Sequence, residues 1–490
     1  MTMDQMSATE ATTPEHLETL LAAAEPASRA WAAATPVRRA EVLDVVAQAL
    51  DGAADELVPL AMSETHLAEG RLRGELKRTT FQLRLFGEVL RDGHYLDVRI
   101  DPADADWPMG VPRPDLRRWK EALGPVVVFA ASNFPFAFSV AGGDTASALA
   151  AGNAVLLKAH PGHAGLSHRT GQILTESLRA AGAPDGLFAV IYGREAGTTA
   201  LKDSRVKAGG FTGSIPGGRA LFDLATSRPD PIPFYGELGS NNPVFVTAGA
   251  AASRTNEIAE GFLSSATMGA GQFCTKPGTL VVPAGSGLVD RLRGAALAEP
   301  ATLLNERIQE GYTHVLEQLS GHPAIDVLAQ GDDPLADPPS PTLLRTTAED
   351  MLADPDALQR ECFGPTALVV EYSDESQLVE VAESFEGQLT ATVFAAEDED
   401  VRDLVTVLAR KAGRVLWGQW PTGVSVTYAQ QHGGPYPATT AVGFTSVGTA
   451  AIERWLRPVA YQGFPQAQLP EALRDENPLD IPQTVNGRTR

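Results

Sequence analysis

From Gly124 onward the sequence alternates between short apolar runs and amphipathic segments, and this alternation restricts the fold more than any other feature. The runs PVVVFA, NAVLLKA, LFAVIY and VKAGGFTG have the pattern of buried strands, whereas FSVAGGDTASALAAG, LSHRTGQILTESLRAAG and GGRALFDLAT have that of helices. Strands that alternate with helices predict a parallel sheet with right-handed crossovers, whose ligands bind at the carboxyl ends of the strands. We therefore expect an α/β fold whose first half binds a nucleotide, although the G-x-G-x-x-G fingerprint is absent.

A second series of strands and helices follows the segment GELGSNNPVFV and includes TLVVPAG, LTATVFAA and RVLWGQW. Ahead of both series, residues 14–91 repeat apolar positions at helical spacing, and YLDVRIDP with DLRRWKE indicates an exposed hairpin of the kind that often pairs with another subunit. The expected division is N-terminal helices of the cofactor domain (1–94), an oligomerisation hairpin (95–120), a nucleotide-binding domain (121–236), a catalytic domain (237–427) and a C-terminal segment returning to the cofactor or oligomerisation region (428–490).

Composition excludes several classes of function. The chain has 490 residues, enough for two or more cores, and its net charge of -22 without a long Lys/Arg run argues against nucleic-acid partners and anionic membranes. Two cysteines rule out a disulfide framework and fit a reducing compartment. The segment MTMDQMSATEATTPEH lacks a targeting pattern, and no apolar run is long enough to span a membrane, so we expect a cytoplasmic protein.

Two segments hold candidate catalytic side chains. GAGQFCTKPG places Cys274 after a helical pattern, among glycines that let a ligand approach the backbone closely. Such a position suits a reactive thiolate, whereas an isolated cysteine is more simply a buried, inert side chain, which is all we expect of Cys362. In FYGELGSNNP, Glu237 lies between an apolar strand and a Gly/Asn turn, where burial would raise the pKa of its carboxyl toward the range of a general base. The alternative for Glu237 is a capping or solvated side chain.

Together with VVVFAASNFPFAFS, LLKAHP, GFTGS and ECFGP in their observed order, these two segments resemble the aldehyde dehydrogenase family over roughly residues 124–455. The resemblance implies a Rossmann-type cofactor domain, a second α/β catalytic domain and an oligomerisation hairpin. It also implies NAD(P)-dependent oxidation of a small-molecule aldehyde through a cysteine thioester, by a homodimer or homotetramer. We expect no metal.

The family's catalytic roles fall on three residues. By resemblance, Cys274 is the nucleophile that attacks the aldehyde carbonyl, and Glu237 activates the water that hydrolyses the thioester and could help to deprotonate the thiol. Asn133, in the turn SNFP, would donate its side-chain amide to the developing oxyanion, together with the backbone N–H of Cys274. An ordinary turn residue ahead of an extended X-Pro step is the alternative for Asn133.

Five residues match the family's contacts with the nicotinamide cofactor. Lys158 resembles the lysine that reaches the adenosine ribose, and Gly213 with Ser214 resembles the helix start that binds the pyrophosphate. Glu361 and Phe363 match the pair that positions the nicotinamide ribose and ring.

The choice between NADP and NAD depends on charge near the adenosine ribose, because an acidic residue there repels the 2′-phosphate of NADP. Many NAD-preferring relatives have an acidic residue three positions after the strand-end lysine, where this chain has Pro161. His160 and Arg194 could add positive charge, although Arg194 could also be an ordinary surface residue. We favour NADP, with NAD as the alternative.

This sequence departs from the family's common pattern in its ELGS segment, which is usually ELGG, and at Asp144, where many members have a lysine that relays protons to the base. For Asp144 we favour a helix cap over a role in orienting water. The resemblance hints that His432, in QHGGP, lies near the active site, but we favour a loop histidine without function. Arg454 and Arg457 could receive a substrate carboxylate or could lie on a solvated helix face.

The branch of the family that this chain most resembles is the 2-oxoglutarate semialdehyde (2,5-dioxopentanoate) dehydrogenases, through NFPFAFS, FYGELGSNNP, HGGPYPATT and TSVGTAAIERWLRPV. Oxidation of a fatty or other aldehyde is one alternative. Transfer of the acyl group to coenzyme A is another, and Glu237 argues against it because acylating members commonly lack that base. A non-catalytic binding protein on the same scaffold is the alternative from a different class.

Overall fold

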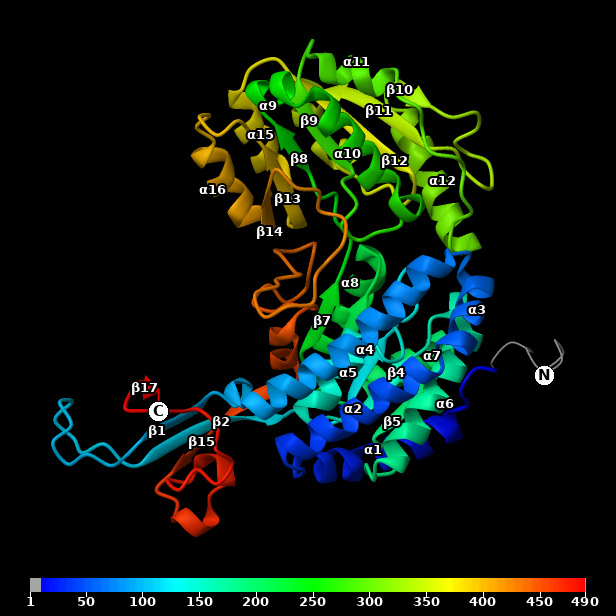
Figure 1. Cartoon of the computed structure of the whole chain (residues 1–490). Coiled ribbons are helices and arrows are strands. Elements are labelled where there is room, and N and C mark those ends of the chain that lie inside the picture. Colours follow the sequence, from blue (N-terminus) through cyan, green and yellow to red (C-terminus); the bar gives the residue numbers. More distant parts are fainter. Residues whose placement is uncertain (1–9, 490) are drawn as a thin grey trace.

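Three sheets organise the chain, which is described here from a computed structural model that covers residues 10–489. The first nine residues, part of the segment in which we expect no targeting pattern, lie outside the described residues, as does Arg490. In Figure 1 one sheet forms the lower lobe, a second forms the upper lobe, and the third extends sideways from the lower lobe as an arm. None of the described helices is long and apolar enough to cross a bilayer.

The first sheet is parallel throughout and has the strand order β5-β4-β3-β6-β7, which confirms the predicted alternation. Its central strand β3 is an unbroken apolar run, Val126–Phe129, because both faces of the sheet are covered. From β3 the chain moves outward through β4 to β5 and then returns to β6 on the other side. This reversal of direction predicts a ligand crevice at the carboxyl ends of β3 and β6.

The elements of this half are the strands β3 (Val126–Phe129), β4 (Val155–Lys158), β5 (Phe188–Ile191), β6 (Ala208–Thr212) and β7 (Phe234–Glu237), with the helices α1 (Pro14–Ala32), α2 (Pro36–Gly52), α3 (Ala54–Thr65), α4 (Glu69–Asp92), α5 (Gly143–Ala151), α6 (Ala164–Ala180), α7 (Arg194–Lys202) and α8 (Ile215–Thr226).

The second sheet has the order β10-β11-β12-β9-β8-β13-β14 and is parallel except for the antiparallel pair β10–β11. Its elements are the strands β8 (Val244–Val246), β9 (Thr279–Pro283), β10 (Asp326–Gln330), β11 (Thr342–Thr347), β12 (Thr366–Tyr372), β13 (Gln388–Phe394) and β14 (Ala412–Trp417), with the helices α9 (Ala248–Ser253), α10 (Thr255–Thr267), α11 (Gly287–Arg293), α12 (Glu306–Ser320), α13 (Ala348–Ala353), α14 (Pro355–Leu358), α15 (Ser376–Ser384) and α16 (Arg402–Lys411).

The third sheet forms the arm and has the order β15-β2-β1-β16-β17. The strands β1 (Val98–Asp101) and β2 (Leu116–Ala122) are antiparallel, so the predicted hairpin is present. The C-terminal strands β15 (Leu456–Gln462), β16 (Gln483–Val485) and β17 (Arg488–Thr489) complete the sheet, with β15 beside β2 and β16 beside β1. The tail therefore joins the hairpin within one chain.

Candidate active site

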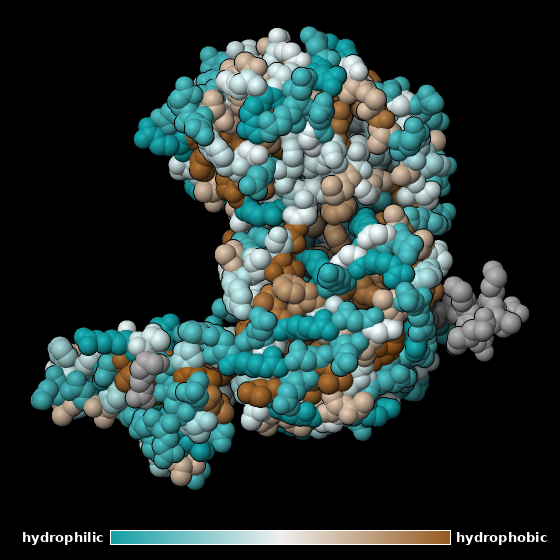
Figure 2. Space-filling model, in the orientation of Figure 1, coloured by the Kyte–Doolittle hydropathy of each residue, from teal (hydrophilic) through white to brown (hydrophobic). Residues whose placement is uncertain are grey.

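The carboxyl edge of the first sheet brings together four of the residues singled out in the sequence. Lys158 and Glu237 are the last residues of β4 and β7, Gly213 directly follows β6, and Asn133 lies in the loop after β3. Because parallel strands end at the same edge, residues more than 100 positions apart in the sequence share one crevice. This is the edge that faces the upper lobe, and Figure 2 shows the surface hollowed between the two lobes.

Cys274 enters this crevice from the second half of the chain, in a tight loop that follows α10. Gly269 and Ala270 both adopt left-handed backbone angles, with φ of +57° and +55°, so the chain reverses direction there. Such a conformation is uncommon for alanine and is typical of functional sites. The side-chain amide of Asn242 donates to the carbonyl oxygens of Cys274 and Lys276, both at 2.9 Å. These bonds fix the loop while the thiol stays partly exposed.

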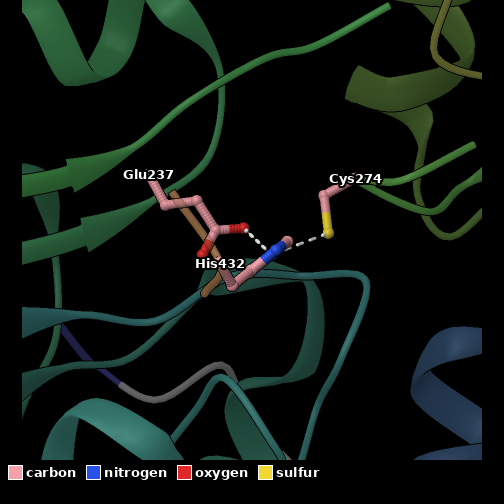
Figure 3. Close-up of side chains that lie close together, drawn as sticks. All are labelled: Glu237, Cys274 and His432. Carbon is pink, nitrogen blue, oxygen red and sulfur yellow. Dashed lines mark hydrogen bonds and ion pairs between the residues drawn. The ribbon is translucent and has the colours of Figure 1, made fainter. Parts of the chain in front are cut away.

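A histidine connects the thiol to the carboxylate. His432 Nε2 lies 2.8 Å from Glu237 Oε1 and 3.6 Å from Cys274 Sγ, and Figure 3 shows its ring between the two. His432 and Glu237 are both buried, so water does not separate them. A proton can therefore move between Cys274 Sγ and Glu237 Oε1 by way of His432 Nε2. His432 is a loop residue, as expected, and it lies at the centre of the site, as the resemblance hinted; a catalytic role for it is a proposal.

The C-terminal segment holds this histidine in position. Its backbone N–H donates to Thr445 Oγ1 at 2.8 Å, and Ser446 Oγ donates both to the carbonyl oxygen of His432 and to the second carboxylate oxygen of Glu237. The same segment continues along β7, where the N–H of Leu238 donates to the carbonyl oxygen of Ala438 at 2.8 Å. Glu237 is thus fully hydrogen-bonded by a loop some 200 residues away in the sequence.

Charge in the site separates the pKa values of the thiol and the carboxyl. Burial raises the pKa of the Cys274 thiol well above its ordinary value, and the nearby carboxylates of Glu237 and Glu361 raise it further. For Glu237, burial also favours the neutral acid. The charge and the hydrogen bond of His432, together with the hydrogen bond of Ser446, outweigh this effect of burial and lower the pKa of Glu237. The predicted upward shift for Glu237 is therefore wrong, because sequence alone did not reveal its hydrogen-bond donors.

Asn133 lies beside the cysteine loop and is buried. Its side-chain amide nitrogen donates to the carbonyl oxygen of Gln272 at 3.1 Å. An amide nitrogen carries two N–H donors, so one remains for a ligand atom. The geometry suits the predicted role of stabilising an oxyanion near Cys274.

Asp144 and Arg454 form a buried ion pair beneath the crevice. Arg454 Nη2 lies 2.6 Å from Asp144 Oδ1, and Arg454 is only 2% exposed. Helix α5 has no side-chain cap, so the predicted capping role of Asp144 is wrong, as is the solvated face for Arg454. The charge of Arg454 helps to lower the pKa of Glu237. Arg457 is exposed and therefore fits the solvated alternative.

All of the predicted cofactor residues line one large cavity, of about 2470 Å³, that ends at Cys274 and Asn133. Its wall contains, in particular, Lys158, His160, Arg194, Gly213, Ser214, Glu361 and Phe363. Helix α8, 12 residues long, begins directly after Ser214 and directs its free N–H groups into the cavity, where they suit an anionic diphosphate. Burial raises the pKa of Glu361 to about 7. The cavity exceeds an ordinary small-molecule pocket and fits a dinucleotide.

One prediction about charge in this cavity needs correction. Burial, with the charges of neighbouring His163 and Lys158, lowers the pKa of His160 to about 3, so its ring is neutral at pH 7. Its Nδ1 instead accepts a hydrogen bond from the N–H of Gly162 at 3.1 Å. The positive charge expected of His160 is therefore absent, whereas Arg194 is exposed at the cavity wall and keeps its charge.

The catalytic cluster is also a possible metal-binding group. One ligand atom each of Glu237, Cys274 and His432 lie within 4.8 Å of one another. The three types of side chain suit zinc. Our expectation that the protein uses no metal stays a prediction.

Comparison with known proteins identifies the family to which this arrangement belongs. A sequence model of the aldehyde dehydrogenase family matches residues 1–315 and 317–457, most of the chain. The chain belongs to the aldehyde dehydrogenase family. Two relatives cover 92% of this chain and 87% of their own length: alpha-ketoglutaric semialdehyde dehydrogenase of Acinetobacter baylyi, 43% identical, and alpha-ketoglutaric semialdehyde dehydrogenase 2 of Azospirillum brasilense, 45% identical.

Solved structures show the same aldehyde dehydrogenase fold. An aldehyde dehydrogenase from Bacillus cereus aligns with a TM-score of 0.77, 19% identity, and coverage of 91% of this chain and 88% of that one. A 1-pyrroline-5-carboxylate dehydrogenase from Thermus with bound NAD aligns with a TM-score of 0.75, 20% identity, and coverage of 91% and 85%.

Sequence reasoning brought Cys274, Glu237 and Asn133 of this aldehyde dehydrogenase together but missed the part played by His432. The available signal was the glycine pair that follows it. A Cβ at Gly433 or Gly434 would collide with backbone oxygens of distant segments, so this loop passes directly against other chain segments. Cys362, as predicted, is a buried side chain outside the reacting cluster.

Replacing His432 tests the connection between base and thiol. We expect His432→Gln to lower kcat roughly 100-fold, because the proton acceptor next to the sulfur is lost. Since His432 lowers the pKa of Glu237, the acid limb of the kcat/KM profile should also move to higher pH. The measurement is a pH-rate profile for wild type, His432→Gln and the control His94→Gln, whose ring is exposed beside Asp92. If kcat and the pH profile of kcat/KM do not change in His432→Gln, this histidine has only a packing role.

Proposed function

We propose that this aldehyde dehydrogenase oxidises 2-oxoglutarate semialdehyde to 2-oxoglutarate through a thioester on Cys274, with NADP favoured as the hydride acceptor. The observation that carries the chemistry is the contact of His432 with both Cys274 and Glu237, which gives a nucleophile and a base one shared proton path. The choice of substrate is supported by the two relatives of that name, each more than 40% identical over nearly the whole chain.

Acylation begins at the thiol. As Cys274 Sγ bonds to the aldehyde carbon, the thiol proton passes to His432 Nε2 while Nε2 gives its own proton to the adjacent carboxylate of Glu237. The carbonyl oxygen becomes an alkoxide, which the amide of Asn133 and the backbone N–H of Cys274 stabilise by hydrogen bonds. When bound, the nicotinamide cofactor accepts the hydride that leaves this carbon. The carbon–sulfur product is a thioester.

Hydrolysis then uses Glu237 as the base. Its carboxylate takes a proton from water as the water oxygen bonds to the thioester carbon. The carbon–sulfur bond then breaks, the carboxylic acid leaves, and the Cys274 thiolate takes the proton back through His432. The lowered pKa of Glu237 favours release of the proton that it received during acylation, so its carboxylate is ionised at pH 7 when the water arrives. Ser446 and His432 hold both carboxylate oxygens in place for this step.

The cavity residues support a nicotinamide dinucleotide and favour NADP. Lys158 has no carboxylate within ion-pair distance among residues 10–489, and burial lowers its pKa, so an anionic or polar ligand group would satisfy it. Arg194 and Arg307 add exposed positive charge to the same wall. The position three residues after Lys158 is Pro161, which cannot repel a 2′-phosphate. NAD remains the alternative acceptor.

A homo-oligomer, either dimer or tetramer, fits the surface of the chain. The arm extends away from the lobes and exposes Met109 (76%) and Val111 (60%), and the edge strand β14 exposes Trp417 (49%). Exposed apolar side chains next to an unpaired strand edge favour contact with a second copy. A solution mass equal to one chain would contradict this proposal. The two unpaired cysteines support a reducing, cytoplasmic location, which cell fractionation would test.

The deciding experiment is steady-state reduction of NADP and NAD, in parallel, with 2-oxoglutarate semialdehyde, succinate semialdehyde, glutaraldehyde and a long-chain aldehyde. We expect the highest kcat/KM with 2-oxoglutarate semialdehyde and NADP, and a rate that coenzyme A does not change. A preference for the long-chain aldehyde would keep the mechanism and reject the substrate. Turnover that requires coenzyme A would reject hydrolysis.

A further inference from the structure

One face of helix α4 carries three charged side chains toward the protein interior. Arg71, Glu75 and Arg78 are separated by four and three residues, so they lie on the same side of the helix. Glu75 is buried, and both arginines are mostly buried. Ionised groups are rarely buried without partners, so each of the three needs an explanation.

Two of the three have partners within the protein. Arg71 Nη2 donates to the carbonyl oxygen of Asn133 at 2.6 Å, and its guanidinium group lies over the rings of Phe134 and Phe273. Glu75 Oε1 accepts hydrogen bonds from two backbone N–H groups of the loop after β3, at 2.8 and 2.9 Å. Arg71 Nε and Nη1 and Glu75 Oε2 are buried without a partner, but each of the two residues has at least one hydrogen bond that fastens the loop presenting Asn133.

Arg78 has no such partner. It makes no hydrogen bond and no ion pair with any residue in the described range 10–489, and its Nη1 is completely buried. Its guanidinium carbon lies 5.5 Å from the centre of the Phe138 ring, and the charge of Glu75 acts on it without a hydrogen bond or an ion-pair contact. A buried guanidinium group without an acceptor is costly, and arginine does not lose its proton to avoid that cost. A hydrogen-bond acceptor on a bound ligand would give the Arg78 guanidinium group the partner that the described residues do not supply.

The position of Arg78 points to the substrate. Its guanidinium group faces Phe138, which packs against Phe134, the residue after Asn133, and Phe134 in turn packs against Phe273, the residue before Cys274. Arg78 therefore lies on the aromatic side of the reacting centre, where its charge also acts on Cys274, and it is not part of the wall of the cofactor cavity. Phe134 stacks near Phe138 and Phe273, with ring centres 5.4 and 5.2 Å apart, and none of these rings lines the cofactor cavity. Beside the sulfur there is thus an apolar wall next to one unpaired cation.

We propose that Arg78 is the anchor for the carboxylate that 2-oxoglutarate semialdehyde carries at the end opposite its aldehyde, an inference that rests on the proposed function. Arg78 Nε and Nη2 are not among the enclosed atoms and have no hydrogen-bond partner within residues 10–489, and this edge of a guanidinium group binds a carboxylate through two parallel N–H donors. The aromatic rings cover the methylene groups between the two ends. Anchoring the far end fixes the distance of the aldehyde carbon from Cys274.

Arg414 is the other guanidinium group whose charge reaches Cys274, but it is already occupied. Its Nη2 donates to the carbonyl oxygen of Pro421 at 2.7 Å, and its Nη1 donates to that of Gly423 at 3.2 Å. Arg414 therefore holds the backbone at Pro421 and Gly423 and adds positive charge near Cys274. Arg78 has no such hydrogen bonds, so its accessible donors are free for a ligand.

The test compares a charged and an uncharged aldehyde of similar length, 2-oxoglutarate semialdehyde and pentanal, with wild type, Arg78→Gln and Arg78→Lys. We expect Arg78→Gln to lower kcat/KM for 2-oxoglutarate semialdehyde roughly 10- to 100-fold, mainly through KM, and to lower kcat/KM for pentanal much less, because pentanal has no carboxylate to lose. Arg78→Lys should fall between, because it keeps the charge but loses the fork. The inhibition constant of 2-oxoglutarate should rise by a similar factor in Arg78→Gln. The matched control is Arg84→Gln, on the same helix, whose partner is the surface residue Asp51.

The outcomes separate this inference from the proposed function. If wild type does not prefer 2-oxoglutarate semialdehyde to pentanal, the proposed function fails, and the anchor fails with it. If wild type has that preference and Arg78→Gln keeps it, the function stands and the anchor is wrong. An equal loss for both aldehydes would indicate that Arg78 only supports the fold, and would also overturn the proposal.

Discussion

Replacing Cys274 with alanine is expected to abolish aldehyde oxidation, with a fall in kcat of about 10,000-fold or more, while the enzyme still binds NADP. The loss is this large because, among the described residues that line the crevice, Cys274 carries the only thiol. Cys362, the other cysteine, is buried between Glu361 and Phe363 and does not contact Glu237 or His432. The residues proposed to hold the cofactor, at the end of β4 and the start of α8, come from other segments, so cofactor binding should not depend on the thiol.

The measurement pairs single-turnover formation of NADPH with cofactor titration by fluorescence, for wild type, Cys274→Ala and the control Cys362→Ala. Because burial and nearby carboxylates raise the pKa of the Cys274 thiol, alkylation of the cofactor-free enzyme by iodoacetamide should speed up as pH rises through 9. The same reagent should label Cys362→Ala normally and Cys274→Ala hardly at all. Retained oxidation in Cys274→Ala would reject the covalent mechanism, and fast alkylation with a plateau near neutral pH would reject the raised pKa.

Local pattern was sufficient to predict the framework of the fold. Buried parallel strands read as continuous apolar runs, as in Val126–Phe129, and the helices between them show apolar positions at helical spacing. Residues at strand ends, such as Lys158 and Glu237, could therefore be assigned to one edge before any coordinates were known. Cys274 was found through the glycines around it, which the tight loop requires.

Contacts between distant segments were not predictable in the same way. His432 is 195 residues from Glu237 and 158 from Cys274. The sequence QHGGP does not indicate which strand its loop packs against. Asp144 and Arg454 are 310 residues apart, so each alone resembled a cap or a surface charge. In α4, only the packing of the helix shows that Arg78 faces inward while Arg73 pairs with Glu69 at the surface.

The direction of the Glu237 pKa shift was missed for the same physical reason. Burial was correctly expected and does raise the pKa, but the sign of the net shift depends on donors supplied by the C-terminal segment. Ser446 and His432 contact the two carboxylate oxygens separately. In the folded protein, the lowered pKa favours the ionised form of Glu237 at neutral pH, so Glu237 is available as a base.

Glu237→Gln is the second variant with a large expected effect, because it should stop the cycle after the thioester forms. A glutamine cannot take a proton from water, so hydrolysis should slow roughly 100- to 10,000-fold. Hydride transfer should be affected less, since His432 still contacts the thiol at 3.6 Å. Mixing enzyme, NADP and aldehyde should then give a rapid burst of about one NADPH per active site, followed by slow turnover, which is the kinetic sign of an accumulating acyl-enzyme.

Stopped-flow absorbance at the NADPH band measures the burst, and mass spectrometry of the quenched protein should find the acyl group on the peptide that contains Cys274. The control Glu257→Gln alters an exposed carboxylate paired with Arg254 and should behave as wild type. Adding hydroxylamine, which attacks thioesters without needing a base, should restore part of the turnover in Glu237→Gln. If the variant shows no burst and no acyl-enzyme, Glu237 is required for formation of the thioester. His432 alone would then be insufficient as acceptor of the thiol proton, and the carboxylate of Glu237 would have to take it.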